Sequence, residues 1–226
     1  MDILNIILQL LEGFGITVLL FLIILVLALP LGLLVSFLSL SKIKIVKMVT
    51  RAFISVIRGT PLMLQLIVVF YGPGLMFGAG AGFKDVFSIL NSGRFIAAVV
   101  AFVINYAAYF SEIFRGGIES VPKGQREAGQ VLGLSKGQIF RKIVLLQVIK
   151  NIVPPLGNEI ITLVKDTSLA RTIMVIELTD IAFDLRKAQG GGIWPLLAAG
   201  LFYFVFNAIV AFILRKIEKR LSYIRF

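Results

Sequence analysis

Long uncharged stretches alternate with short charged segments along this chain. The first uncharged stretch runs from Gly13 to Ser41 and contains 29 residues. About 20 apolar residues are needed for a helix to cross the hydrocarbon core of a membrane. The pattern therefore predicts an all-α membrane protein in which residues 1–226 form a single domain with five membrane-spanning helices. The expected spans are residues 14–40, 59–78, 94–114, 143–165 and 194–214.

The stretches between these spans differ in kind. Gly72 to Ser92 is rich in glycine and is expected to be irregular. Asp166 to Gly192 mixes apolar and charged residues and is expected to contain short helices. Pro154 and Pro155 fall inside the fourth expected span, where they are predicted to break the helix.

Charge supplies an orientation for the five spans. The chain has 23 Lys and Arg against 12 Asp and Glu, a net charge of +11. Seventeen of the 23 basic residues fall in segments 42–58, 115–150 and 215–225, which a five-span arrangement places on one side. Because cytoplasmic loops carry the excess of Lys and Arg, we predict a multi-pass protein of the cell (cytoplasmic) membrane with its N-terminus outside and its C-terminus in the cytoplasm. The net charge is then an orientation signal, and no nucleic acid partner is expected.

Two missing residue types narrow the possible chemistry. The chain has no Cys and no His, which excludes disulfides, Cys/His zinc sites and Ser-His-Asp triads. It also lacks a phosphate-binding loop of the GxxxxGK[ST] type. We therefore expect no catalytic residue, no metal site and no cofactor in this chain, which is not predicted to be an enzyme.

The segment between the third and fourth spans predicts a helix, a turn and a second helix. Pro122 suits a helix start, Gly133 suits a helix end, and Ser135 with Gln138 forms a capping-box pattern. Such a cytoplasmic loop, at about residues 120–140, is suited to docking against a partner. It is equally compatible with a linker that only reorients the chain.

Several motifs in this order resemble one family of transport proteins. The loop resembles the EAA loop of the permease subunits of binding-protein-dependent ABC transporters, and other segments resemble the polar amino acid branch of that family (importer permeases of the His/Arg/Gln type). The resemblance covers roughly residues 13–220. The residues that carry it are Glu127-Ala128-Gly129, Gly133, Ile143 and Leu145 in the loop, Arg58-Gly59-Thr60-Pro61-Leu62 with Gln65, Ala108-Tyr109 with Glu112 and Arg115-Gly116-Gly117, and Pro154-Pro155-Leu156-Gly157-Asn158-Glu159 with Leu163–Leu169.

The resemblance implies a type I ABC importer permease-like fold and a set of partners. A separate ABC ATPase dimer would supply the ATP and Mg²⁺ site, a second permease chain (identical or a sister) would complete the pathway, and an extracytoplasmic amino-acid-binding protein would deliver substrate. Contact with the ATPase is expected from Glu127, Ala128, Gly129 and Gly133, with Lys123 and Arg126 as a charged rim. Gly129, Leu146 and Arg171 depart from the family pattern.

Polar residues inside the expected spans are candidates for the substrate pathway. An ionisable residue within a span marks a functional site by default. Asn158, Glu159 and Thr162 follow the two prolines and could line a pocket for an amino acid, although Glu159 could instead pair with Lys165 or Arg58. The other pathway candidates are Gln65, Thr60 and Glu112.

Polar residues in the third span and at the ends of the third and fourth spans have other expected roles. At i, i+3 spacing, Glu112 and Arg115 are expected to form a local ion pair. Asn105 and Tyr106 are expected to pack, and Asp166 to gate or pair.

Together these features predict the membrane subunit of an ATP-driven importer of polar amino acids, with basic amino acids among the candidate substrates. The alternative function is a channel or an ion-coupled secondary transporter for small solutes. A secondary transporter would be expected to show two discontinuous helices in matching halves, and this sequence suggests one.

Overall fold

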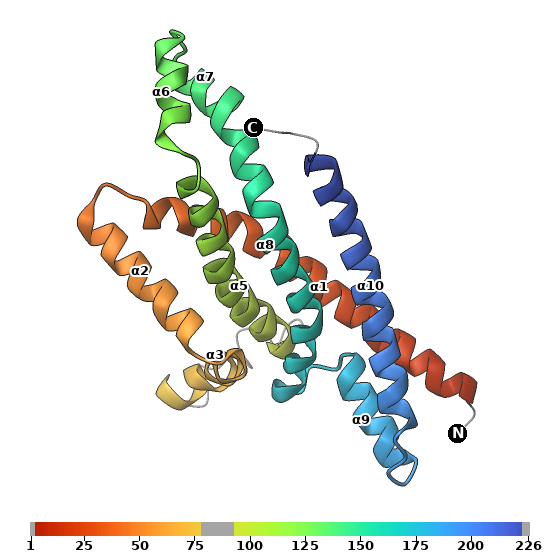
Figure 1. The fold of residues 1–226 in the computed structure, drawn as a ribbon. Helices are drawn as coiled ribbons and strands as arrows, with labels where there is room; N and C mark the ends of the chain where they lie inside the picture. The colour runs from red at the N-terminus through yellow and green to blue at the C-terminus, as the bar shows by residue number, and fades with distance from the viewer. Residues whose placement is uncertain (1–2, 78–92, 223–226) are drawn as a thin grey trace.

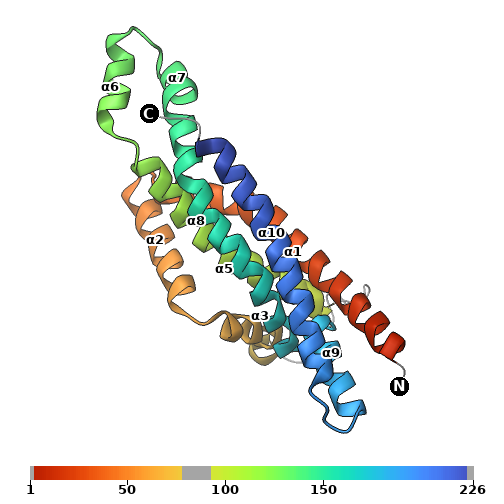
Figure 2. The ribbon, with the colours of Figure 1, turned by 45° about the vertical axis from the view of Figure 1, so that its right-hand side comes forward.

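The computed structural model describes residues 3–77 and 93–222, and this part of the chain is helical with no strands. A π-helical turn, Phe140–Val144, precedes α8, and a 3-10 helix, Thr167–Ile173, follows it. The helices form an elongated bundle with α6 and α7 at one end and α9 at the other (Figures 1 and 2). The predicted all-α class is confirmed. The helices are α1 (Ile3–Ser39), α2 (Lys44–Gly59), α3 (Leu62–Phe77), α5 (Gly93–Glu119), α6 (Lys123–Val131), α7 (Lys136–Ile139), α8 (Leu145–Asp166), α9 (Leu178–Ala188) and α10 (Trp194–Ser222).

Helix α5 is the centre of the bundle and packs against α1, α2, α3 and α8. Small buried residues on α5, among them Ala97, Ala101 and Ala108, let neighbouring backbones come close. On α1 a Cβ added at Gly32 would lie 2.7 Å from Phe110 Cβ, so the closest approach of these two helices requires glycine. The main core is therefore formed where α1 crosses α5.

The five expected spans are not all matched. Among the described residues, α1, α5 and α10 are long and apolar enough to cross a membrane, and α2 with α3 makes a fourth candidate if the bent pair is one span. The expected second span began at residue 59, but the chain bends there by 106° between α2 and α3. Pro61 explains the break, because it forces Thr60 into an extended conformation (φ −114°, ψ 144°).

The fourth expected span is present as a helix but is not apolar enough to qualify as a candidate. Helix α8 has 22 residues, close to the expected length, and carries Lys150, Glu159, Lys165 and Asp166. The predicted break at Pro154 and Pro155 was wrong, since α8 continues through both prolines as one helix.

The other local predictions have mixed outcomes. The short helices expected between Asp166 and Gly192 are present as the 3-10 helix and α9. The irregular structure expected from Gly72 was wrong for its first residues, which belong to α3, while residues 78–92 lie outside the described part of the chain. Helix α10 begins at Trp194 as predicted and continues into the basic C-terminal segment.

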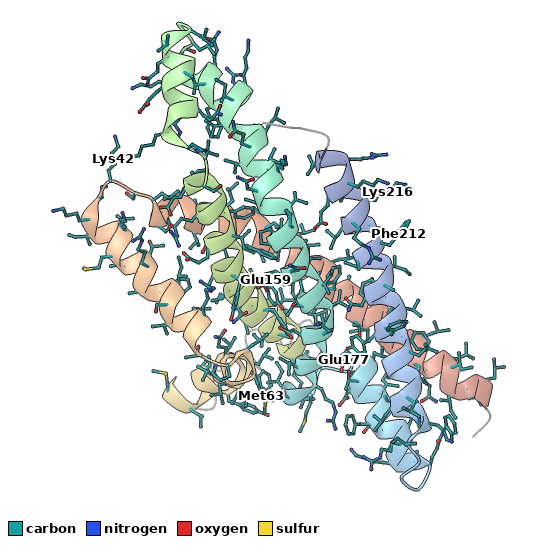
Figure 3. All side chains as sticks on the ribbon, viewed as in Figure 1. Lys42, Met63, Glu159, Glu177, Phe212 and Lys216 are labelled. Carbon is teal, nitrogen blue, oxygen red and sulfur yellow. The ribbon has the colours of Figure 1, made fainter. Side chains whose placement is uncertain are left out.

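A buried carboxylate joins three helices at the α9 end of the bundle (Figure 3). Glu177 is 0% exposed and caps α9, accepting hydrogen bonds from the backbone N–H of Thr179 (2.9 Å) and Asp180 (3.0 Å). It also accepts from the Tyr203 hydroxyl on α10 (2.9 Å) and, more weakly, from Thr17 Oγ1 on α1 (3.4 Å). Burial raises the pKa of Glu177, and the hydrogen bonds from Thr179, Tyr203 and Asp180 act against that shift.

Candidate functional site

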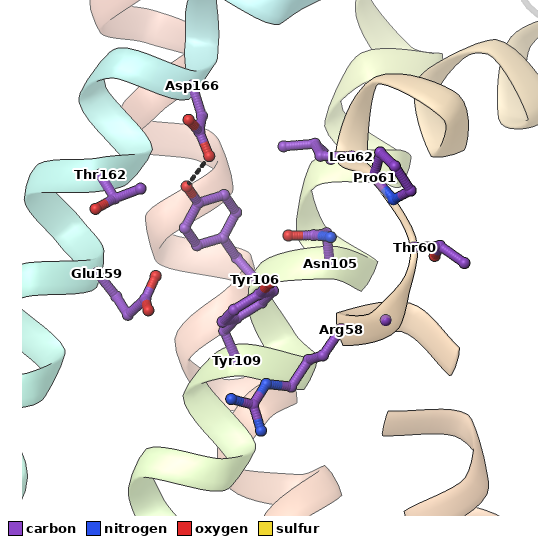
Figure 4. A pocket seen from close by; sticks show the side chains of 11 residues that line it. Arg58, Thr60, Pro61, Leu62, Asn105, Tyr106, Tyr109, Glu159, Thr162 and Asp166 are labelled. Carbon is purple, nitrogen blue, oxygen red and sulfur yellow. Dashed lines mark hydrogen bonds between the residues drawn. The ribbon is translucent and has the colours of Figure 1, made fainter. Parts of the chain in front are cut away.

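A cavity of about 400 Å³ lies where the break between α2 and α3 faces α5 and α8 (Figure 4). Its volume falls within the range of roughly 300–1,000 Å³ that is usual for small-molecule sites. Three segments far apart in sequence form its wall. The residues that line it are Arg58, Gly59, Thr60, Pro61, Leu62, Asn105, Tyr106, Tyr109, Glu159, Thr162 and Asp166.

Helix α8 contributes two carboxyl groups and a hydroxyl. Glu159, Thr162 and Asp166 are three and four residues apart, so they lie on one face of the helix. From α5, the Tyr106 hydroxyl donates a 2.7 Å hydrogen bond to Asp166 Oδ2. Asp166 is thereby held in the cavity wall, and in Figure 4 Glu159 and Asp166 lie on either side of Tyr106.

The break between α2 and α3 is held by the side chain of Gln65. Gln65 Nε2 donates to the carbonyls of Ile57 (2.8 Å) and Thr60 (3.1 Å) and to Thr60 Oγ1 (2.9 Å). Its Oε1 accepts a 3.0 Å hydrogen bond from Asn105 Nδ2 on α5. Gln65 is not one of the lining residues, but it fixes both the bend and the orientation of Asn105, which is.

The opposing charge comes from Arg58, the last basic residue of α2. Its guanidinium carbon lies 5.1 Å from the centre of the Tyr109 ring, and Nη1 lies 3.6 Å from Glu112 Oε2. Glu112 in turn accepts hydrogen bonds from Arg115 Nε (2.9 Å) and Nη2 (2.6 Å), so the local ion pair predicted from their spacing is confirmed. The cavity therefore has two carboxyl groups and one guanidinium in its wall. Within the described residues, no group of three or more acidic side chains is placed to hold a metal ion.

The structure brings together half of the pathway residues predicted from sequence. Thr60, Glu159 and Thr162 line the cavity, whereas Gln65, Glu112 and Asn158 do not. Asn158 is exposed, and its carbonyl accepts a 3.0 Å hydrogen bond from Thr162 Oγ1. A transport role for each of the six stays a prediction.

Sequence reasoning missed five polar lining residues as pocket candidates: Arg58, Asn105, Tyr106, Tyr109 and Asp166. A signal was available on both helices. Asn105 and Tyr109 are four residues apart, and Asp166 is seven residues after Glu159, so each pair occupies one helix face.

The helix–turn–helix predicted for the segment between α5 and α8 is confirmed. Helix α6 starts after Pro122, the turn places Gly133 in the left-handed region (φ +71°), and Ser135 with Gln138 forms the predicted capping box. The turn exposes two apolar side chains, Val131 (88%) and Leu132 (75%). We call residues 123–139 the α6–α7 hairpin.

Five of the six residues predicted to contact an ATPase are exposed on the α6–α7 hairpin, namely Lys123, Arg126, Glu127, Ala128 and Gly133. Gly129 is buried instead. A Cβ at this position would lie 2.9 Å from Ile139 Cγ1 and 3.0 Å from Ile143 Cδ1. The departure from the family pattern at Gly129 is thus explained by packing inside the hairpin.

The departure at Arg171 also has a structural explanation. Its guanidinium carbon lies 3.6 Å from the centre of the Phe183 ring, and its Nε lies 3.5 Å from Asp180 Oδ1. Both partners belong to α9. Arg171 therefore ties the 3-10 helix to α9.

Comparison with known proteins identifies relatives that cover most of the chain. The arginine transport system permease protein ArtQ of Bacillus subtilis (strain 168) is 36% identical over 212 residues, which is 94% of this chain and 92% of the relative. The glutamine transport system permease protein GlnP of Escherichia coli (strain K12) is 39% identical over 179 residues, or 77% and 75% of the two chains.

A solved structure shares the fold. A chain from a crystal structure of an amino acid ABC transporter with histidines superposes with a TM-score of 0.81 at 30% identity, covering 97% of this chain and 99% of the other. The family model for the inner membrane component of binding-protein-dependent transport systems matches residues 28–223. The helical bundle, its polar cavity and these matches lead to one conclusion: the chain belongs to the family of inner membrane components of binding-protein-dependent transport systems.

Proposed function

We propose that this chain is the membrane subunit of an ATP-driven importer and that its cavity takes cationic amino acids. The observation that carries the proposal is the placement of Glu159 and Asp166 in one cavity wall with a single guanidinium, Arg58, opposite them. An amino acid has one carboxylate and one ammonium group. Arg58 suits the carboxylate and one acidic residue suits the ammonium, which leaves the second acidic residue for a cationic side chain.

The Tyr106 hydroxyl gives Asp166 a partner when the cavity is empty of substrate. A buried carboxylate without a hydrogen bond or an ion pair is costly, and the 2.7 Å bond from Tyr106 satisfies part of that need. An incoming ammonium group then joins or replaces the hydroxyl. Similarity to an arginine transport permease supports the same substrate class.

The α6–α7 hairpin is proposed as the contact with a separate ATPase, which holds ATP and Mg²⁺. Val131 and Leu132 are apolar side chains at an exposed tip, and Lys123, Arg126 and Glu127 are exposed charged residues earlier on the same helix. An apolar centre with a polar rim is typical of a protein–protein contact. In this arrangement the hairpin, and with it the C-terminus, lies in the cytoplasm, while the N-terminus lies outside.

The rest of the proposed assembly follows from the same function. A second permease chain, identical or a sister, completes the pathway, and an extracytoplasmic binding protein delivers the amino acid. Helix α8 and the bent α2–α3 pair join α1, α5 and α10 to give five membrane-crossing segments. Glu159 and Asp166 of α8 are tolerated because they face the cavity.

Uptake by the reconstituted complex tests the proposal. Proteoliposomes containing the chain, its ATPase and the binding protein are offered a panel of radiolabelled cationic, neutral and acidic amino acids. Glu159→Gln and Asp166→Asn are expected to raise the half-saturating concentration of arginine or lysine roughly 10- to 150-fold, because a hydrogen bond to a charged group contributes about 1.5–3 kcal/mol. Asp184→Asn, the same chemical change at an exposed acidic residue of α9 that does not line the cavity, is the matched control. Unchanged uptake of the cationic substrates in both acidic variants would refute the substrate assignment.

Coupling is tested separately with Glu127→Ala, which leaves the cavity intact. ATP-driven uptake is expected to be lost while binding of amino acid to the purified permease is retained. Uptake at the normal rate would refute the role of the hairpin, and uptake against a gradient by the permease without its ATPase would refute the importer itself.

A further inference from the structure

Helix α2 carries its basic residues on one face. At 3.6 residues per turn, Lys44, Lys47, Arg51 and Arg58 fall within an arc of about 60°. Ser55 lies at the edge of this arc. Lys44, Arg51, Ser55 and Arg58 are exposed and Lys47 is half-buried. We call these five residues the basic face of α2.

The other exposed face of α2 is apolar. Ile45, Val49 and Val56 are 68%, 59% and 62% exposed, and Ala52 lies with them. These side chains point about 140° away from the basic face. The helix therefore has two different surfaces. The apolar surface is suited to contact with lipid or with another apolar surface, and the charged surface is not.

The basic face runs from one end of the bundle to the cavity. Helix α2 begins near Lys42, at the end that carries the α6–α7 hairpin, and descends beside α5 to the bend (Figures 1 and 3). Its last basic residue, Arg58, lines the cavity. Arg58 Nη1 also lies 3.6 Å from Glu112 Oε2 of α5. The basic face thus meets α5 at the bend, and its residues follow α2 from the hairpin end of the bundle to the cavity.

Charged side chains within a membrane span face a bundle interior or a water-filled space and mark substrate or ion pathways. Glu112 can offset only part of the charge here, because it already accepts two hydrogen bonds from Arg115. We propose that the basic face of α2 is the wall of a water-filled exit from the cavity to the cytoplasm, and that its positive charge draws anions into that space. This inference rests on the proposed function for the cytoplasmic position of the hairpin.

Cysteine labelling tests the wall directly, since the chain has no cysteine of its own. Ser55→Cys places one thiol on the basic face, and Val56→Cys places one on the apolar face at the same depth. Each variant, in the nucleotide-free complex, is treated in inside-out vesicles with an anionic (sulfonatoethyl) or a cationic (trimethylammonioethyl) methanethiosulfonate. Rates are divided by those of a free thiol in solution. Both reagents reach a thiol that faces water and neither reaches one that faces lipid.

Ser55→Cys is expected to react quickly and to prefer the anionic reagent by about tenfold, because a cleft of one charge sign concentrates the opposite ion. Val56→Cys is expected to react slowly with both reagents. Arg51→Gln in the Ser55→Cys background should reduce the anionic preference, and Lys47→Gln gives a second measurement if the Arg51 variant does not assemble. The proposal is overturned if Ser55→Cys reacts no faster than Val56→Cys, or if its reactivity shows no preference for the anion.

Uptake measured on the same variants separates this inference from the proposed function. An intact labelling pattern in a complex that transports no amino acid would leave the water-filled wall standing and refute the importer. Normal uptake with an unreactive Ser55→Cys would refute the wall and leave the importer standing.

Discussion

Removing the carboxylate of Glu177 should weaken the attachment of α9 to the rest of the bundle. In Glu177→Ala the N-cap of α9 is lost, which costs about 1 kcal/mol. The buried hydroxyl of Tyr203 loses its 2.9 Å acceptor, and an unsatisfied buried donor costs about 1–3 kcal/mol, whereas Thr17 keeps its hydrogen bond to the Gly13 carbonyl. Relief of the carboxylate from burial offsets part of these losses. The free energy of unfolding should therefore fall by about 2–4 kcal/mol.

The assay is reversible unfolding of the purified chain in mixed micelles with increasing sodium dodecyl sulfate, followed by circular dichroism. Asp184→Ala is the matched control on α9, because Asp184 is 67% exposed and forms a local ion pair with Lys187. Such a surface pair contributes about 0–1 kcal/mol. If Glu177→Ala destabilised the chain no more than Asp184→Ala, the joining role of Glu177 would be refuted.

Three further predictions follow from the same contacts. Gly129→Ala should destabilise the α6–α7 hairpin by about 1 kcal/mol despite the better helix propensity of alanine, because its Cβ would lie 2.9 Å from Ile139 Cγ1. Hydrogen exchange of α6 measures this, and Gly124→Ala on the same helix, where nothing lies within 4 Å of the added Cβ, should increase protection; equal effects of the two changes would contradict the overlap. Gln65→Ala should lower the melting temperature and weaken substrate binding together, because it frees the bend and Asn105; a change in neither measurement would contradict that role. Because the pKa of Glu177 is raised, folding favours its protonated form. The stability that comes from this protonation is complete below the unfolded pKa of about 4.5 and is lost as the pH rises through the folded pKa. Glu177→Gln should remove this slope from the free energy of unfolding measured between pH 4 and 8, and an unchanged slope would contradict the prediction.

The sequence was most informative where a single segment determines its own structure. The α6–α7 hairpin needs only Pro122 at a helix start, Gly133 in a left-handed turn and the Ser135–Gln138 capping box, and each of these was readable from local pattern. The ion pair between Glu112 and Arg115 is local in the same sense. Neighbouring residues on one helix meet whatever the rest of the fold does.

The cavity was only half predicted because its walls come from three segments far apart in sequence. Tyr106 and Asp166 are 60 residues apart, and nothing in either local sequence shows that their side chains meet. The number of membrane spans was difficult to predict for a related reason. A run of uncharged residues does not reveal that Pro61 turns the chain, nor that Glu159 and Asp166 of α8 face a cavity.

The continuity of helix α8 has a mechanical consequence, because a continuous helix can transmit a movement from one end to the other. Its first residue follows the π-helical turn at the hairpin, and its last residue is Asp166, so its 22 residues span about 33 Å at 1.5 Å per residue. If the hairpin end pivots and the helix stays rigid, a tilt of about 10° displaces the far end by about 6 Å, since displacement scales with the length of the arm. That is more than twice the 2.7 Å that separates Tyr106 from Asp166. A rotation of this size at the hairpin end would therefore break the hydrogen bond between Tyr106 and Asp166 in the cavity wall if α5 stayed in place.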